Sequence, residues 1–229
     1  MVINMFLCFV ITLLSGLTTL LGSLIIFINI KDKNKIISYS MFFSSGVMLY
    51  ISIFDLIPAS FSYINKIYDF IPSMAIMGAY GLFGGMLVRY FDRNTNNDNK
   101  LYKIGIISMI TLIIHNIPEG IITFVSSSKN ISLGLSLSLS IALHNIPEGI
   151  AIAIPIYYGE NSKKKAFYYT LIAALSEPLG ALIGIMFINN INDYLFAILL
   201  SLTSGIMIYL SIFELYKEGK IYRKKEILY

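Results

Sequence analysis

Uncharged apolar stretches long enough to cross a bilayer recur along the whole chain, and this pattern limits the folds open to it. A transmembrane helix needs about 20 consecutive apolar residues. Seven such stretches can be drawn, at about 3–30, 36–58, 71–91, 103–127, 131–158, 166–188 and 192–214. Hydrophobic residues make up 56% of the chain and charged residues 13%, with a mean hydropathy of +0.74. The connections are too short for a soluble domain, so we predict an all-α polytopic membrane protein with one domain over residues 1–229.

The first stretch, at about 3–30, is interpreted as a retained helix, although its apolar character is also that of a signal peptide. No basic residue precedes it, it has no small-x-small cleavage pattern, and it is longer than a signal-peptide core. Cys8 is the only cysteine, so no intramolecular disulfide is expected. The net charge of +4 reflects topology, because the basic residues lie between the apolar stretches, and it indicates no nucleic-acid partner.

The basic residues predict the orientation of the chain in the membrane. Of the 17 Lys and Arg, 15 fall on one side of the seven spans: in segments 31–35, 89–103 and 163–165 and in the tail after residue 216. The other side has only Lys66 and Lys129. Basic loops stay in the cytoplasm. We therefore expect a multi-pass protein of the cell membrane with an outside N-terminus, a cytoplasmic loop at 92–102 and a cytoplasmic basic tail at 216–229.

An internal repeat relates the second and seventh spans. Residues 44–56 (SSGVMLYISIFDL) closely match residues 203–215 (TSGIMIYLSIFEL), although the predicted orientation sends the two spans in opposite directions. This arrangement is typical of the inverted repeats of secondary transporters. The repeat would place Asp55 at the outer end of its helix and Glu214 at the inner end of the other, one at each mouth of a pathway. The alternative is that both are ordinary interfacial carboxylates.

A duplicated hexapeptide contains the main candidate functional residues of the chain. The string His-Asn-Ile-Pro-Glu-Gly stands at 115–120 and again at 144–149, and its two copies hold the only histidines of the chain. A tight turn near 126–130 would make spans 4 and 5 antiparallel neighbours, with both motifs about 20 Å from the same membrane face. Within each motif the His and the Glu, four residues apart, share one helical face. Ionisable side chains at this depth usually mark an ion or substrate pathway.

The residue types in the motif favour a divalent transition metal. Pro118 and Pro147 leave backbone carbonyls without their helical donors, and Gly120 and Gly149 allow helices to approach closely. Imidazole, carboxylate and amide oxygen together suit Zn²⁺, Fe²⁺, Mn²⁺ or Co²⁺ and not an alkali ion. The candidate ligands are His115, Asn116, Glu119, His144, Asn145 and Glu148. A single buried His is commonly a packing residue, but packing gives no reason to repeat five polar or special residues together.

These residues resemble the ZIP family of metal transporters, most closely its bacterial ZupT-like and GufA-like members. The resemblance covers most of the chain: Gly-Val-Met-Leu in span 2, the two hexapeptides, Ser-Glu-Pro-Leu-Gly-Ala at 176–181 and Gly-Ile-Met in span 7. It implies an inverted-repeat fold with a binuclear metal centre at the membrane midplane. It also implies uptake into the cytoplasm, a homodimer, and an elevator-like movement of spans 1, 4, 5 and 6 against the remaining spans.

The resemblance also implies residue roles. One metal site would use His115, Glu119, His144 and Glu148, with Met48 of span 2 as a soft ligand. The neighbouring site would use Asn116, Glu119, Asn145 and Glu148. Glu177 in span 6 would be a further pathway carboxylate. Plain packing is the alternative for Met48, and a hydrogen-bonded buried carboxyl is the alternative for Glu177.

The chain departs from the family pattern in three places. Members have eight spans, so the seven seen here lead us to expect a truncated chain or an incomplete scaffold. Many relatives have His before the span 7 Glu, where this chain has Phe213, which weakens a cytoplasmic exit site at Glu214. The loop between spans 3 and 4 lacks the His-rich tract of eukaryotic members.

The sequence therefore predicts a transporter of divalent metal ions with no enzymatic activity and no resident cofactor. Zn²⁺ is the first candidate for the transported ion, and Fe²⁺, Mn²⁺, Co²⁺ and Cd²⁺ are further ones. Two alternatives stay open at this point: a metal-binding receptor that does not transport, and an intramembrane metalloenzyme. The enzyme is disfavoured because the chain has two histidines and no His-Glu-x-x-His motif.

Overall fold

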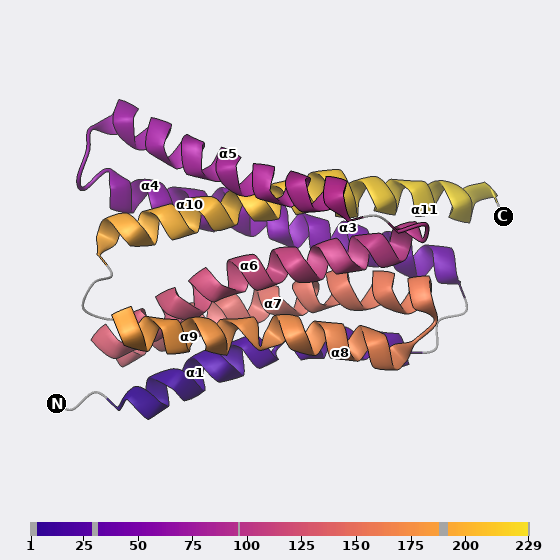
Figure 1. Ribbon diagram of the computed structural model, residues 1–229, viewed down its shortest axis with the longest axis horizontal. Helices are drawn as coiled ribbons and strands as arrows, with labels where there is room; N and C mark the ends of the chain where they lie inside the picture. Colours follow the sequence, from indigo (N-terminus) through magenta and orange to yellow (C-terminus); the bar gives the residue numbers. More distant parts are fainter. Residues whose placement is uncertain (1–3, 29–31, 96, 188–191, 229) are drawn as a thin grey trace.

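The computed structural model describes residues 4–28, 32–95, 97–187 and 192–228, and its regular elements are all helical (Figure 1). In chain order they are α1 (Met5–Leu17), α2 (Thr19–Ser23), η1 (Leu24–Phe27), α3 (Lys33–Ile51), η2 (Ser52–Leu56), α4 (Ile57–Ile64), α5 (Phe70–Asn94), α6 (Lys100–Lys129), α7 (Ile131–Glu160), α8 (Lys163–Ala174), α9 (Ser176–Phe187), α10 (Asp193–Tyr209), η3 (Leu210–Tyr216) and α11 (Lys217–Leu228). The segment η1 is a 3₁₀ turn, whereas η2 and η3 are π-helical.

Within the described ranges, seven helical stretches are long and apolar enough to cross a membrane. They are Met5–Phe27, Lys33–Ile64, Phe70–Asn94, Lys100–Lys129, Ile131–Glu160, Lys163–Met186 and Asp193–Glu226. The predicted all-α polytopic fold with seven visible spans is therefore confirmed. The helices of spans 2 and 7 are longer than predicted, since they continue to Ile64 and Glu226. The predicted span limits at residues 3, 30 and 188 lie outside the described residues.

Polar residues at the starts of the helices show why the elements begin where they do. The first backbone N–H groups of a helix have no partner within it, and a short polar side chain satisfies one of them. Asn4, Asp32, Asn99, Ser162 and Asn192 each accept a hydrogen bond from the backbone N–H three residues later. Each of these caps directly precedes the first residue of its helix.

The helices fall into two groups. One group contains α3, α4, α5, α10 and α11, and the other contains α1, α2, α6, α7, α8 and α9 (Figure 1). Contacts between α3 and α7 and between α6 and α10 join the two groups. The helices α6 and α7 are the most buried of the membrane-length helices, so the two motifs lie in the middle of the molecule.

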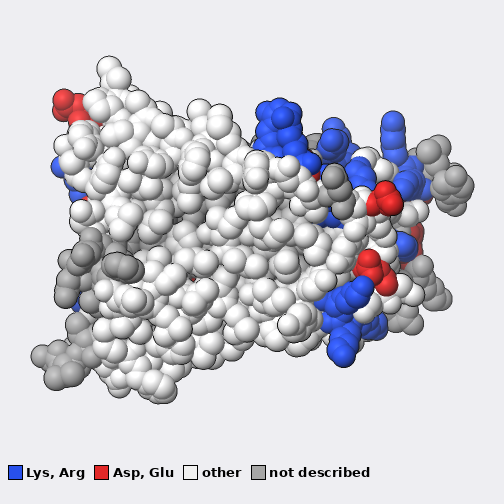
Figure 2. Space-filling model, in the orientation of Figure 1, with Lys and Arg blue, Asp and Glu red and all other residues white. Residues whose placement is uncertain are grey.

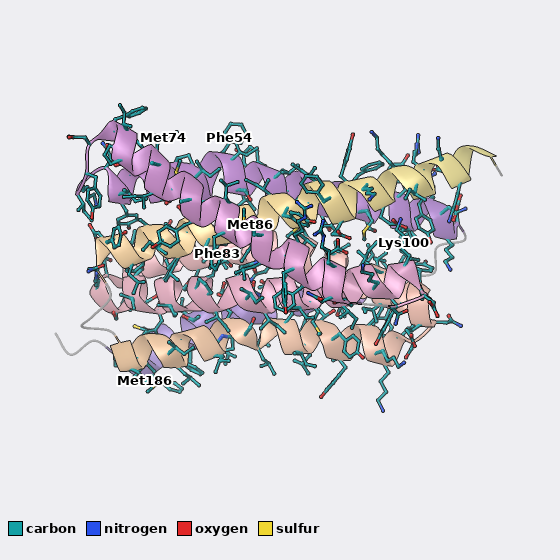
Figure 3. All side chains as sticks on the ribbon, turned by 45° about the horizontal axis from the view of Figure 1, so that its top comes forward. Phe54, Met74, Phe83, Met86, Lys100 and Met186 are labelled. Atoms are coloured by element: carbon teal, nitrogen blue, oxygen red, sulfur yellow. The ribbon has the colours of Figure 1, made fainter. Side chains whose placement is uncertain are left out.

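The outer surface matches a lipid environment over most of its length. Phe54, Met74, Phe83, Met86 and Met186 are exposed and stand out from the helices (Figure 3). The Lys and Arg side chains gather at one end of the molecule, the end that carries α11 (Figure 2). We call this end the basic end. It shows that the charge asymmetry predicted from the sequence is also an asymmetry in space.

The repeated segments of spans 2 and 7 share an unusual backbone. The π-helical segments η2 and η3 begin at Ser52 and Leu210, so they cover equivalent parts of the two repeat copies. Each copy packs against the other, because α3 contacts η3 and α10 contacts η2. The Ser45 hydroxyl donates to the Ser211 carbonyl at 3.1 Å across this interface. π-Bulges are rare in proteins overall, but those that occur are frequently found at functional sites.

Glycines set the crossing of α5 and α10. A Cβ placed on Gly205 would collide with the backbone of Gly81, and a Cβ on Gly84 would collide with the Leu202 carbonyl. By contrast, a Cβ on Gly78 of the same helix pair would meet no atom within 4 Å. The close approach at Gly205 therefore depends on the missing side chain.

We expect Gly205→Ala to lower the free energy of unfolding by about 1–3 kcal/mol, because the added methyl forces the two backbones apart. Gly78→Ala is the matched control, since both substitutions raise helix propensity but only the first creates a clash. Thermal unfolding in detergent measures the difference. Equal stability of the two variants would show that the crossing is not tight.

Candidate metal centre

The two hexapeptides face each other across the contact between α6 and α7. The His115 Nε2 lies 3.0 Å from the Glu148 Oε1, and the His144 Nε2 lies 3.4 Å from the Glu119 Oε2. Each histidine is therefore paired with the glutamate of the other motif. The arrangement is reciprocal, as a local two-fold relation between two antiparallel helices requires.

A one-residue connection produces this register. α6 ends at Lys129, α7 begins at Ile131, and Asn130 between them accepts hydrogen bonds from the N–H groups of Ser132 and Leu133. Both helices have 30 residues, and each motif is near the middle of its helix. Because the helices are about 45 Å long at 1.5 Å per residue, the paired motifs lie far from both ends.

The paired side chains are almost completely removed from solvent. His115 and Glu148 are fully buried, and Glu119 and His144 are 3% exposed. Each carboxylate uses one oxygen toward a histidine, while its second oxygen and both Nδ1 atoms have no hydrogen-bond partner within the part of the chain that the structure describes. Unpaired buried polar atoms are costly, and a site with several of them is suited to a cation that can satisfy them.

The two asparagines of the motifs have different surroundings. The Asn145 Nδ2 donates to the Glu177 Oε2 at 2.8 Å and to the Ser15 carbonyl at 3.1 Å, which leaves its Oδ1 unpaired. Asn116 is fully buried and neither end of its amide has a partner among the described residues. Both asparagines thus have an amide oxygen without a hydrogen-bond partner among the described residues, and this oxygen is the atom that the predicted ligand set would use to bind a metal.

Glu177 is connected to the motifs through Asn145. It is fully buried at the start of α9, and a Cβ on Gly120 would collide with its carbonyl oxygen. A Cβ on Gly149 would likewise collide with the Thr19 carbonyl of α2. The two motif glycines therefore bring α9 and α2 against α6 and α7, as the sequence predicted for close helix approach.

Met48, which is on α3, lies at the same depth as the His144 motif of α7. The Lys33 Nζ donates to the Tyr158 carbonyl at 3.3 Å, and the Ser44 Oγ donates to the Pro147 carbonyl at 2.6 Å, so α3 and α7 run antiparallel. Met48 is one turn beyond Ser44 on the same face and is fully buried. The structure thus brings the predicted soft ligand to the depth of the motif.

The predicted position of the two pathway carboxylates at helix ends is wrong. Asp55 lies inside η2 and Glu214 inside η3, and both helices continue, to Ile64 and Leu228. The first continues because the residues after Asp55 stay apolar, with Pro58 in the first turn of α4. The second continues because Glu218 is buried and paired with Lys100. Asp55 is exposed and Glu214 is half-buried.

The predicted metal ligands are not arranged around one point. Over the described ranges, no group of three or more His, Cys, Asp or Glu side chains forms a ready metal cluster. The structure instead shows two His–Glu pairs, with Glu177 beyond Asn145. A metal ion would replace the hydrogen bonds of these pairs with bonds to the same imidazole nitrogens and carboxylate oxygens. The binuclear geometry stays a prediction.

Sequence reasoning missed two contributors, Ser15 and Ser44. Both bind to the motif region through atoms that leave little trace in a sequence: Ser15 offers its backbone carbonyl to Asn145, and Ser44 donates to the carbonyl of Pro147. The only available signal was that Ser44 opens the repeat of residues 44–56.

Comparison with known proteins gives consistent matches. The model of the family described as "ZIP Zinc transporter" matches residues 88–225. The chain is 35% identical over 242 residues to the zinc transporter ZupT of Streptococcus mutans, covering 98% of this chain and 91% of the relative. It is 38% identical over 246 residues to the zinc transporter ZupT of Oceanobacillus iheyensis, covering 96% and 90%. The same protein of Campylobacter jejuni is 35% identical over 262 residues, again with 96% and 90% covered.

We expect Glu148→Gln to weaken the binding of Zn²⁺ by at least tenfold, or more than about 1.4 kcal/mol, because it removes one of two negative charges from a buried site. Calorimetry on the detergent-solubilised protein measures the affinity. Glu160→Gln is the control: Glu160 ends the same helix and pairs with Lys165 at the basic end. Equal affinities of the two variants would contradict a metal centre at the motifs.

Proposed function

Because the chain belongs to the ZIP family, a family of transporters and not of enzymes, we propose that it carries zinc ions across a membrane by way of the paired motifs of α6 and α7. The observation that carries this proposal is the reciprocal pairing of His115 with Glu148 and of His144 with Glu119 at the centre of the two most buried membrane-length helices. The curated relatives that match nearly the whole chain are described as zinc transporters.

Electrostatics explains why this site suits a dication. Moving a divalent ion from water into a low-dielectric interior is expensive unless opposite charge is already there. Glu119 and Glu148 supply two negative charges, and the two imidazoles supply nitrogen ligands that Zn²⁺ favours. None of these ligands is a thiolate, so the ion is held by groups of middling strength and is able to leave as well as enter.

The finer description of the site is also a proposal. One ion would be bound by His115, Glu119, His144 and Glu148 with Met48, supported by the depth of Met48 on α3. A second ion would be bound by Asn116, Asn145 and the same two glutamates, supported by the free amide oxygens. Glu177 would accept the ion, or would hold Asn145 in place, through the hydrogen bond between them.

We propose that the basic end faces the cytoplasm and that transport is uptake toward it. The clustering of Lys and Arg at that end supports this orientation (Figure 2). The protein would then lie in the cell membrane with its N-terminus on the outer side. Asp55 would then meet the ion on the outer side of the motifs and Glu214 on the inner side. The group of α1, α2 and α6–α9 corresponds to spans 1, 4, 5 and 6, the part proposed to move like an elevator.

The metal range and the assembly belong to the same proposal. Fe²⁺, Mn²⁺, Co²⁺ and Cd²⁺ can use the same nitrogen and oxygen ligands as Zn²⁺, so competition among them is expected. A homodimer is proposed on the family resemblance alone.

Zinc flux into proteoliposomes tests the function. We expect flux with the unchanged protein, loss of flux to below a tenth with His144→Ala and with Glu148→Gln, and normal flux with the control Glu160→Gln. The reason is that the first two changes remove a ligand and the third changes a side chain at the basic end. Zinc binding without flux in the unchanged protein would support a receptor and would overturn the proposal.

Met48→Leu tests the soft ligand. Leucine keeps the volume and apolar character of methionine but has no sulfur. We expect the variant to lose several-fold more affinity for Cd²⁺, the softer ion, than for Zn²⁺, because thioether ligands favour soft metals. Competition binding measures the two affinities on one protein. An equal loss for both ions would indicate that Met48 only packs.

A further inference from the structure

Three buried hydroxyls that have no hydrogen-bond partner among the described residues lie between the motifs and the basic end. Ser108 and Thr111 stand on α6, seven and four residues before His115, and so share its helical face. Ser211 stands in η3, which packs against α6 and α3. All three are at most 1% exposed. We call them the hydroxyl column.

Ser211 lies at the depth of Ser108. α6 and the α10–η3–α11 helix run antiparallel, since Lys100 pairs with Glu218 at 2.5 Å at the basic end and Lys129 lies 5.6 Å from the ring centroid of Phe196 at the other. Ser211 is seven residues from Glu218, and Ser108 is eight residues from Lys100. The hydroxyls of the two helices are therefore level with each other.

None of the three hydroxyls has a hydrogen-bond partner among the residues that the structure places. Buried hydroxyls in helices commonly donate to the carbonyl four residues earlier, as Thr170 does to Ala166 at 2.9 Å. The internal repeat provides a closer comparison: Ser52, the equivalent of Ser211 in the other copy, donates to the Met48 carbonyl at 2.7 Å. The Ser211 hydroxyl is thus unpaired in the same local sequence and the same π-helical backbone.

The column ends near charged groups at the basic end. Glu214 follows Ser211 by three residues and is half-buried. Two ion pairs join the start of α6 to its neighbours: Lys103 with Asp92 of α5 at 2.9 Å, and Lys100 with the buried Glu218 of α11. The column therefore runs from the paired motifs to an end where α6 is bound to the other helix group by charge.

We propose that the hydroxyl column is the inner half of the ion path, closed to solvent at its surface in this conformation. This inference rests on the proposed transport function. Unpaired hydroxyls in a membrane interior are costly, and a passing hydrated divalent cation and its waters would satisfy them. Neutral hydroxyl oxygens can replace part of a hydration shell without holding the ion tightly, which suits a path between a binding site and an exit.

Cysteine accessibility tests the path. Ser108→Cys, Thr111→Cys and Ser211→Cys are introduced separately into a Cys8→Ala background, which has no other thiol. The control is Thr170→Cys, on α8 at a similar distance from its helix start and with a partnered hydroxyl in the native chain. A cationic thiosulfonate should react with the three column thiols about tenfold faster than with the control, and Zn²⁺ should slow that reaction. Rates equal to the control would overturn the inference.

Flux of the double variant Ser108→Ala/Thr111→Val, which lacks the two column hydroxyls of α6, gives an independent readout. We expect zinc flux to fall roughly five- to tenfold, the factor for a lost hydrogen bond or two, while zinc affinity at the motifs changes less than twofold. Thr170→Val should leave both unchanged. Full flux in the double variant would overturn the inference that the column is part of the ion path. Absence of flux in the unsubstituted protein would contradict the proposed transport, whereas normal flux with unreactive column thiols would contradict the column alone.

Discussion

Hydrogen bonding between the histidines and glutamates of two antiparallel helices makes this structure possible. Four ionisable side chains at the middle of a membrane-length bundle would each be costly alone. Because each histidine meets the glutamate of the other motif, the four groups become two hydrogen-bonded pairs that are nearly free of solvent contact. The glycines of the motifs then let α2 and α9 close over the pairs. In the proposed function, the same pairs exchange their hydrogen bonds for bonds to a metal ion.

The two copies of the inverted repeat, in spans 2 and 7, pack beside this site. The two π-helical segments occur at equivalent positions of spans 2 and 7, and each repeat copy packs on the other. The copies are nevertheless not identical in their hydrogen bonding, because Ser52 is paired and Ser211 is not within the described part of the chain. Symmetry in the backbone is thus combined with asymmetry in the polar groups, as expected when the two sides of a membrane require different chemistry.

Much of the fold and site could be predicted because both depend on strong sequence signals. Apolar length alone identifies seven spans, and the duplicated hexapeptide identifies six of the polar residues that meet at α6 and α7. The cross-pairing of His115 with Glu148 could not be predicted, since it depends on a register set by a single connecting residue. The contacts of Ser15 and Ser44 use backbone carbonyls, which every residue has. The continuation of α10 through η3 into α11 depends on tertiary packing at Glu218, which outweighs the low hydrophobicity of that segment.

The connection at Asn130 also bears on how the chain is made. All four ionisable groups of the centre belong to one helical hairpin, residues 100–160, that leaves the ribosome as a continuous piece. They can form hydrogen bonds with one another while the hairpin enters the lipid, before α8 to α11 have been synthesised. A chain with its histidines on one hairpin and its glutamates on another would have to hold unpaired charges in the translocon until the partner arrived. Contiguity of the motifs would therefore serve biogenesis as well as the proposed ion binding.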